Sequence, residues 1–468
     1  MISDYSALSR RQFLGGSLAG FSLATFPIIA HTAPVSIELA AAASKVRIGE
    51  YTGVPVWLYN QSSPGPEIRV KQGERLNVTL ANSLENPTSI HWHGIRIENG
   101  MDGVPDLTQK KVMPGERFDY SFVTPDAGTY WYHSHVSSSE QVGRGLYGAL
   151  IVDETESYPV DREVTLVIDD WRINEAGVID PSFRNLHDIS HAGRLGNWMT
   201  VNGVNRPDLP VVAGERLRIR LLNVANARIL TLQFDELMPW VIALDGQPYG
   251  PVRLADAKLT LAPGQRADLV IDIPGTSAKD YGLNLLHSRG VLQLARMVVQ
   301  SSQKRNFNDD PGALPANPLA VDFDLENART VELQMQGGAM GRMRTAVYRG
   351  ESLEIRQLVN EGKAWALNGV SDRPREPLFS VQRGRTVVID MHNMNRWPHA
   401  MHVHGHHFRV IEANGENTDA SPWRDTTLMY GHDRVRIAFV ADNPGRWLLH
   451  CHMLEHAAGG MTTWFEVT

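Results

Sequence analysis

A strand-forming motif that begins at a glycine occurs three times in this sequence, and this repeat limits the possible folds more than any other feature. The three copies are residues 73–82, 214–223 and 384–393. In each copy apolar residues alternate with other residues after the glycine turn, which is the pattern of a half-buried β-strand. A strand unit repeated at long intervals predicts a chain built from several copies of one β-domain.

Two further units recur in the same order within each copy. A turn that leads into a second alternating strand is followed by a closing strand with glycine five residues before histidine. The turns are at 114–117, 263–266 and 431–434, and the closing strands at 128–133, 282–287 and 445–450.

The repeats predict an all-β protein of three tandem Greek-key β-sandwich domains. The expected domains are residues 45–155, 156–305 and 318–468, and 301–318, rich in Asn, Asp, Pro and Ser, is the expected linker. The composition agrees, since 40 Gly and 26 Pro favour strands and turns over long helices.

The N-terminus has the pattern of an export signal. Residues 9–14 carry paired arginines, 14–30 form a moderately apolar run, and small residues follow at Ala33 and 40–43. This pattern resembles a twin-arginine signal, so residues 1–44 are expected to be a signal and leader read by the twin-arginine export machinery. The protein is then periplasmic or secreted. The alternative is an uncleaved anchor, but the run is short and contains Gly, so no stable membrane span is expected after signal removal.

Charge and cysteine content exclude other classes. A net charge of −7 is modest for 468 residues and argues against nucleic acid as a partner. The only cysteine, Cys451, rules out an intramolecular disulfide. Its thiol is therefore either buried and inert or used chemically.

Histidine pairs distinguish the copies. The first and third copies each carry two His-x-His pairs, whereas the middle copy has Leu232 and Phe234 at one such place and only His287 at the other, which we interpret as structural. The pairs are His91 and His93, His133 and His135, His402 and His404, and His450 and His452. Alternation along a strand places both members of a pair on one face. Eight imidazoles at an interface between the first and third domains exceed the needs of one metal and predict a cluster, for which Zn, Cu, Fe and Ni are all suitable.

The segment around Cys451 favours copper. Its neighbours offer two further histidines and a thioether, namely His399, His456 and Met461. Two imidazoles, a thiolate and a weak axial methionine are the ligands of a blue-copper electron-transfer centre. The plainer interpretation, a small buried hydrophobic cysteine, is typical of a lone Cys.

Four motifs now resemble the copper signatures of the multicopper oxidases, the laccase and cuprous-oxidase family. They are His91-Trp-His93-Gly, His133-Ser-His135, His399-Ala-Met-His402-Val-His404-Gly and His450-Cys-His452-x₃-His456-x₄-Met461. The resemblance covers the chain from about residue 45 to its end and implies cupredoxin-like domains and four coppers. It implies type 1 copper at His399, Cys451, His456 and Met461, type 2 copper at His91 and His402, and a type 3 pair at His93, His133, His135, His404, His450 and His452.

The resemblance also implies a reaction: one-electron oxidations at type 1 copper coupled to four-electron reduction of O₂ to water. Two residues depart from the family pattern, Ala400 where Pro is common and Ala457 where many bacterial relatives carry a carboxylate. O₂ reduction consumes protons. Asp102 is the first candidate acid, with a turn residue as its alternative role, and Glu455 is a weaker candidate that could instead orient His456.

The reducing substrate stays open between phenols or aromatic amines, as in a laccase, and Cu(I), as in a cuprous oxidase of periplasmic copper tolerance. Met335, Met340 and Met343 are soft ligands suited to Cu(I), or simply loop residues. Asp425 matches a position near type 1 copper in relatives, where it would accept a phenol proton or bind a metal. A remote alternative is a non-enzymatic periplasmic scaffold, which should have lost ligands. His406, His407 and His432 are surplus to the motifs.

Overall fold

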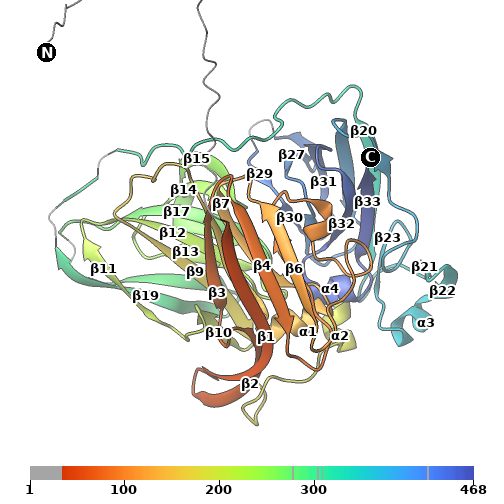
Figure 1. Cartoon of the computed structure of the whole chain (residues 1–468), viewed down its shortest axis with the longest axis horizontal. Helices are drawn as coiled ribbons and strands as arrows, with labels where there is room; N and C mark the ends of the chain where they lie inside the picture. Colours follow the sequence, from red (N-terminus) through yellow and green to blue (C-terminus); the bar gives the residue numbers. More distant parts are fainter. Residues whose placement is uncertain (1–33, 277–278, 303–304, 308, 419–420) are drawn as a thin grey trace, which may run out of the picture. The chain divides into compact units, whose positions relative to one another are not determined.

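Strands dominate the structure, a computed structural model of the chain (Figure 1). It describes residues 34–468 apart from 277–278, 303–304, 308 and 419–420. The signal motif and apolar run predicted within residues 1–33 lie outside the described residues. The predicted all-β class is confirmed, and the described helices are single short turns: α1 (Ser138–Gly143), α2 (Leu186–Ser190), α3 (Ile355–Asn360), α4 (Leu454–Ala458) and the 3₁₀ turns η1 (Asn99–Met101) and η2 (Ala255–Ala257). None of these helices is long and apolar enough to cross a membrane.

The first strand corrects the predicted leader. β1 (Val35–Ile48) pairs in parallel with β4 (Arg75–Asn82), from Val35 opposite Leu76 to Ala41 opposite Asn82. Leu39 and Ala41 are fully buried in the core. Alternating burial along residues 35–44 therefore makes them part of the sheet, and the small residues at 40–43 that were read as the end of a leader are strand residues.

Two four-stranded sheets contain the first repeat, in the orders β2-β1-β4-β6 and β3-β8-β7-β5. Their remaining strands are β2 (Tyr51–Tyr59), β3 (Gly65–Lys71), β5 (Ile90–His93), β6 (Arg117–Val123), β7 (Gly128–Ser134) and β8 (Tyr147–Asp153).

The middle repeat forms a six-stranded sheet, β10-β9-β12-β17-β14-β15, and a five-stranded sheet, β11-β19-β18-β13-β16. The bounds are β9 (Arg162–Trp171), β10 (Trp198–Val201), β11 (Asp208–Ala213), β12 (Arg216–Asn223), β13 (Leu230–Phe234), β14 (Trp240–Leu244), β15 (Gln247–Arg253), β16 (Lys258–Leu261), β17 (Arg266–Asp272), β18 (Tyr281–His287) and β19 (Gly290–Ser302).

The third repeat forms a seven-stranded sheet, β23-β20-β25-β31-β27-β28 with β29 paired to β27, a five-stranded sheet, β24-β33-β32-β26-β30, and the hairpin β21-β22. The bounds are β20 (Arg329–Gly337), β21 (Thr345–Tyr348), β22 (Glu351–Glu354), β23 (Trp365–Leu367), β24 (Ser380–Val381), β25 (Thr386–Asn393), β26 (His399–Val403), β27 (Phe408–Ala413), β28 (Glu416–Asn417), β29 (Trp423–Arg424), β30 (Thr426–Met429), β31 (Arg434–Val440), β32 (Gly445–Cys451) and β33 (Thr462–Val467).

The pairing scheme repeats as the sequence does. The glycine-led strands β4, β12 and β25 each pair antiparallel with the strand after the second turn, β6, β17 and β31, and parallel with the first strand of their copy. The apolar residues that alternate in the sequence, such as Leu76, Leu217 and Val387, are buried. Each copy supplies its own apolar cluster, while residues 34–468 together form one compact unit.

Candidate metal centres

Within the first repeat and within the third, strand pairing places the two His-x-His pairs of that repeat next to each other. In the first repeat β5 lies antiparallel to β7 with His91 opposite His133. In the third repeat β26 lies antiparallel to β32 with His402 opposite His450. Because side chains alternate along a strand, the histidines on each pair of strands project from one face.

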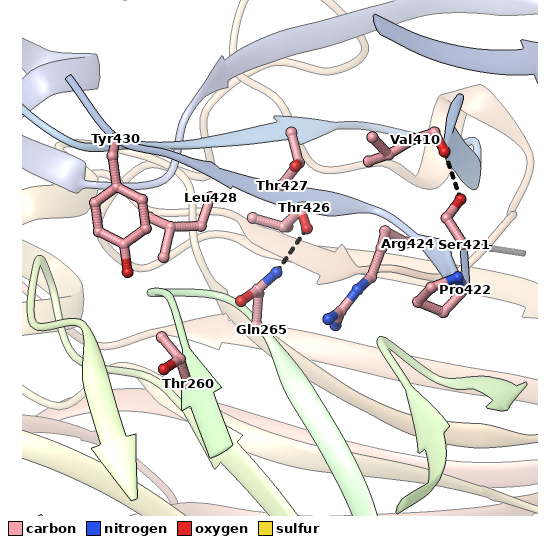
Figure 2. Close-up of a pocket in the computed structure, with 10 residues that line it drawn as sticks. All are labelled: Thr260, Gln265, Val410, Ser421, Pro422, Arg424, Thr426, Thr427, Leu428 and Tyr430. Atoms are coloured by element: carbon pink, nitrogen blue, oxygen red, sulfur yellow. Dashed lines mark hydrogen bonds between the residues drawn. The ribbon is translucent and has the colours of Figure 1, made fainter. Parts of the chain in front are cut away.

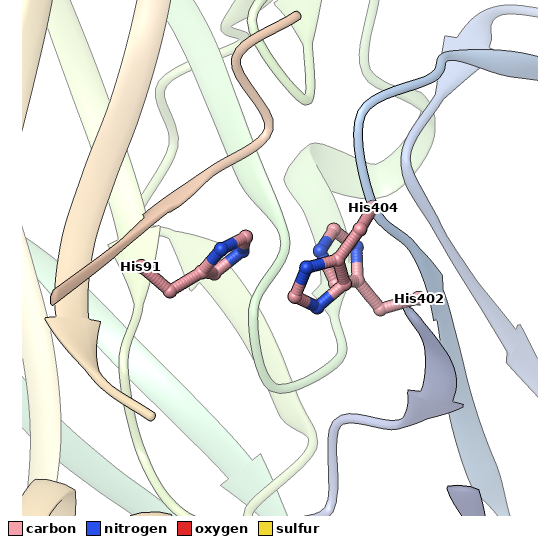
Figure 3. Close-up of side chains that lie close together, drawn as sticks. All are labelled: His91, His402 and His404. Carbon is pink, nitrogen blue, oxygen red and sulfur yellow. The ribbon is translucent and has the colours of Figure 1, made fainter. Parts of the chain in front are cut away.

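The two faces meet, so that all eight paired histidines gather where the first and third repeats pack. His91 stacks on His404 with ring centroids 3.9 Å apart, and His93 stacks on His402 at 3.8 Å. Figure 3 shows His91 reaching from one side towards His402 and His404 on the other. Groups with nitrogens within 4.8 Å of one another are His91, His402 and His404; His91, His93 and His133; and His135, His404 and His450. His452 lies beside this group, 4.8 Å from His93 between ring centroids.

The imidazole nitrogens that point inward fit metal ions. In the described part of the chain several buried ring nitrogens have no hydrogen-bond partner: Nε2 of His91, His133, His135 and His402, Nδ1 of His93, and both nitrogens of His452. Nε2 of His404 faces Nε2 of His450 at 3.0 Å. An unpaired buried polar atom costs about 1–3 kcal/mol. Metal ligation removes that cost, so this donor set suits the copper that all-imidazole sites accept.

The outward-facing nitrogens are held by carbonyl and carboxylate groups. Nδ1–H of His91 donates to the main-chain carbonyl of Asp102 at 2.8 Å, and Nδ1–H of His402 donates to that of Asp425 at 2.9 Å. His450 Nδ1–H donates to the Cys451 carbonyl at 2.9 Å. Such partners fix the ring and leave the other nitrogen for a metal.

Burial keeps these rings neutral. It lowers the pKa of His133, His135, His404 and His452 well below the usual value and that of His450 to about 3. Only neutral imidazole is a ligand. The cluster is therefore ready to bind metal at neutral pH without releasing protons.

Asp102 and Asp425 both lie beside the histidine cluster. The Asp102 carboxylate is 3.0 Å from Nδ1 of His404 and 3.2 Å from Nδ1 of His91, so it joins the two repeats. Asp425 is 3.2 Å from Nε2 of His93 and forms an ion pair with Arg266 at 2.7 Å. The guanidinium and His93 hold the pKa of Asp425 well below its usual value against the effect of burial.

Asp425 is fully buried among His93, His402 and Arg266. A phenol at the surface cannot reach the carboxylate there. The group of His93, His402 and Asp425 could instead hold a metal ion, which is the other role that the sequence suggested for Asp425. Asp425 directly precedes β30, in which Thr426 pairs with His402 and Met429 pairs with His399. Arg266 was missed by the sequence reading, since its only signal is a charged residue at the start of a strand.

A second group of ligands surrounds Cys451. Sγ lies 3.8 Å from Nδ1 of His399 and 3.7 Å from Nδ1 of His456, and the two Nδ1 atoms are 3.1 Å apart. Bonds of about 2.0–2.3 Å to one ion produce separations of this size. Met461 is buried and is linked through its main chain to both Cys451 and His456. Burial raises the pKa of the thiol to about 12, so metal binding must displace its proton.

The middle repeat covers this second group. Nε2–H of His456 donates to the main-chain carbonyl of His191, just after α2, at 2.7 Å. Trp365 packs against the rings of His399 and His456 and donates its Nε1–H to the carbonyl of Ile189 at 2.6 Å. Neither contact had a sequence signal, because the partners are 265 and 176 residues apart in the chain.

Glu455 also contacts the middle repeat. Its carboxylate accepts hydrogen bonds from the Arg194 main-chain N–H at 2.9 Å and from Asn226 Nδ2 at 2.8 Å. Burial raises its pKa to about 7. The carboxylate therefore fastens α4 to the second repeat. His287 is exposed at the end of β18 and belongs to neither group of candidate ligands.

A pocket of about 350 Å³ opens between the middle and third repeats beside the cluster. Figure 2 shows Gln265 crossing it to donate to the main-chain oxygen of Thr426, at 2.8 Å. The hydroxyl of Thr426 lies 3.1 Å from Nδ1 of His402, so one residue separates the pocket from the cluster. The residues that line the pocket are Thr260, Gln265, Val410, Ser421, Pro422, Arg424, Thr426, Thr427, Leu428 and Tyr430.

Comparison with known proteins decides the family. Three family models described as multicopper oxidase match residues 40–157, 162–300 and 344–468. A multi-copper oxidase from Pseudomonas Thermotolerans superposes with a TM-score of 0.81 at 32% identity, covering 93% of this chain and 100% of that one. The chain belongs to the multicopper oxidase family.

Further relatives agree. Lac15 from a marine microbial metagenome is 36% identical with a TM-score of 0.73, over 93% of this chain and 100% of that one. The multicopper oxidase MmcO of Mycobacterium tuberculosis is 29% identical over 98% of this chain and 97% of its own length. This multicopper oxidase is accordingly an oxidoreductase that uses copper and O₂, with cupredoxin-like domains.

Proposed function

We propose that this multicopper oxidase is laccase-like: it couples the one-electron oxidation of phenols and aromatic amines to the four-electron reduction of O₂ to water. The observation that carries the proposal is that one strand contributes side chains to both candidate metal centres, the group around Cys451 and the group of eight histidines. β32 supplies Cys451 to the first group and His450 to the second. An electron accepted beside Cys451 therefore has a covalent route to the histidine cluster.

The proposed ligands are those of four coppers. Type 1 copper is assigned to His399, Cys451, His456 and Met461, type 2 copper to His91 and His402, and the type 3 pair to His93, His133, His135, His404, His450 and His452. Bound copper supplies one-electron redox chemistry and O₂ binding.

The chain's own residues orient these ligands and handle protons. Asp102 accepts from rings of both repeats and is the proposed proton-delivering acid, because O₂ reduction needs protons. Asp425 is held ionised by Arg266 and orients His93 and His402. The pocket that ends at Thr426 offers water and O₂ an approach from the side of His402. Glu455 is used structurally in this scheme rather than as an acid.

The arrangement of methionines favours an aromatic donor over Cu(I). Met335 is fully buried in the core of the third repeat, and Met343 packs against the small apolar cluster near α3. Met340 is 75% exposed, and its Sδ accepts a hydrogen bond from Arg396 at 3.5 Å. These three sulfurs point into different surroundings, and a guanidinium beside the exposed one disfavours a cation.

We also propose that the chain acts in the periplasm or outside the cell after twin-arginine export. The paired arginines at Arg10 and Arg11 and the apolar run behind them support this. That route carries folded proteins, which suits a protein with buried metal sites. Replacing both arginines by Lys should leave the protein in the cytoplasm, which cell fractionation would detect.

One experiment separates the candidate donors. Copper-loaded protein is mixed anaerobically with 2,6-dimethoxyphenol or with Cu(I), the loss of blue absorption is followed, and O₂ uptake is then measured. The phenol should remove the colour and support uptake. Cys451→Ser should lack the blue absorption and turnover but keep its far-UV circular dichroism. Blue absorption in Cys451→Ser would contradict the proposal. So would a wild-type protein that Cu(I) bleaches and the phenol does not.

A further inference from the structure

In this chain, protein atoms cover the proposed type 1 ligand His456, so a reducing substrate cannot touch it directly. His456 is fully buried, and its Nε2–H is used by the main-chain carbonyl of His191. A reducing substrate must therefore pass its electron through whatever covers this nitrogen.

The cover has an aromatic outer face. The rings of His187 and His191 stack at 4.1 Å between centroids with an interplanar angle of 12°. Trp397 lies 5.0 Å from His191 at an angle of 60°. His187 is exposed, and His191 and Trp397 are half-buried. We name these three side chains the α2 entry face.

Hydrogen bonds hold this face in place over the ligands. The Ala339 main-chain N–H donates to the Ser190 carbonyl at 2.7 Å, and Trp397 Nε1–H donates to the Ala339 carbonyl at 3.1 Å. Trp365 also links this segment to the proposed type 1 ligands, because it donates to the Ile189 carbonyl and packs against the ring of His456. The segment is thus a fixed bridge between solvent and His456.

The chemistry of the face selects the donor class. Stacked rings offer π-surfaces to a flat aromatic molecule. Arg396, whose guanidinium is 3.5 Å from Met340 Sδ, adds positive charge at this edge. A cationic metal substrate is disfavoured there, whereas a phenol that gains negative charge as it loses its proton is favoured.

We propose that aromatic donors dock on the α2 entry face and that their electron reaches the type 1 site through the His191 carbonyl and its hydrogen bond from His456. This inference rests on the proposed laccase-like function. The phenolic O–H bond breaks, the proton passes to water because the face is exposed, and a phenoxyl radical leaves. Copper held by His399, Cys451 and His456 would take up the electron, and O₂ would be the final acceptor of four such electrons.

The test blocks the face with a label. Cys451 is the only native cysteine and is fully buried, so a cysteine introduced at the surface reacts alone. His187→Cys and, as a matched control on the same repeat, His287→Cys are coupled to a polyethylene-glycol maleimide. Anaerobic bleaching of the blue band by 2,6-dimethoxyphenol is then timed on the copper-loaded chain, and the midpoint potential of the type 1 site is measured.

Labelled His187→Cys should bleach at least tenfold more slowly than labelled His287→Cys, with the blue spectrum and midpoint potential unchanged. Trp397→Leu should raise the KM for the phenol several-fold, and Trp397→Phe should restore it. A bleaching rate of labelled His187→Cys within twofold of that of labelled His287→Cys would overturn the proposal that donors dock on the α2 entry face. A wild-type protein that the phenol fails to bleach would instead overturn the proposed function, and with it the aromatic donor.

Discussion

Burial and the partner of the second ring nitrogen together determine what each histidine of this chain does. His133 and His450 donate through Nδ1–H to a carbonyl of the next residue and leave Nε2 facing the cluster. His407 is equally buried but contacts Gln247 and the Asp245 carbonyl, outside the proposed ligand set. His287 is exposed. The same residue type thus serves as ligand, core residue and surface residue.

His407 should make the copper-free fold sensitive to acid. Burial lowers its pKa to about 4, although Asp425 and Asp126 oppose this and Arg96 and Arg266 assist it. The unfolded chain binds this proton near pH 6.5, so stability is lost as the pH falls from 6.5 towards 4. Between pH 7 and pH 5 the loss from this group is about 2 kcal/mol.

Urea denaturation of copper-free wild type and His407→Gln at both pH values measures the effect. The drop in unfolding free energy should be about 2 kcal/mol smaller in the variant. His287→Gln should follow wild type, because that side chain is exposed. Equal drops in all three proteins would contradict the assignment.

At this scale the sequence indicated which side chains gather, because their spacing is local. His91 and His93, or Cys451 and His456, are fixed relative to each other by one strand or one turn. The surroundings of Asp425 were not predictable in the same way, because Arg266 and His93 come from other repeats. Contacts of that kind leave no spacing in the sequence.

Among the elements, strands were predictable and the short helices were not. The alternation in β4 matches its buried residues, whereas β12 is buried along its whole length and β25 at all but two positions. In β12 the polar positions are buried too, because Arg218 and Arg220 form ion pairs with Asp268. β1 was missed in part because its run of alanines resembles the end of an export signal. The helices α2 and α4 have five residues each, too short for a helical period, yet both adjoin the group around Cys451.

Glu455 fastens α4 to the middle repeat and should matter for stability. Glu455→Ala removes the acceptor of the Arg194 N–H and of one Asn226 Nδ2 hydrogen, so two buried hydrogens lose their partner. The other Nδ2 hydrogen still donates to the Ser139 carbonyl at 2.7 Å. The expected cost is about 2–4 kcal/mol of unfolding free energy. Glu466→Ala on β33 is the control, since its 3.4 Å pair with Arg446 is partly exposed and should contribute less than about 1 kcal/mol.

Differential scanning calorimetry of the copper-free proteins checks this, and copper content after loading shows whether α4 still positions His456. A loss no larger than that of Glu466→Ala would mean that other contacts hold α4.

Across the whole molecule, two repeats meet through their histidines while the middle repeat covers the group around Cys451. Repetition made the three-part β architecture predictable, because each copy carries the same strand signals. The way the copies pack was not predictable, and the middle repeat shows this best. It lacks the paired histidines, yet it supplies Arg266 to the cluster and His191 to the group around Cys451.

Asp102 tests this arrangement, because it bridges histidines 302 residues and 11 residues away in the sequence. Asp102→Asn keeps the size of the side chain but removes the charge that holds Nδ1–H of His404. Loss of a partner that orients a metal ligand typically costs about 10–100-fold. The O₂-dependent reoxidation rate should fall by that factor, while anaerobic bleaching of the blue band by a phenol should not change. Stopped-flow measurement of the two half-reactions distinguishes them, with the exposed Asp106→Asn of the same loop as control. Equal loss in both halves would mean that Asp102 supports the fold rather than the cluster.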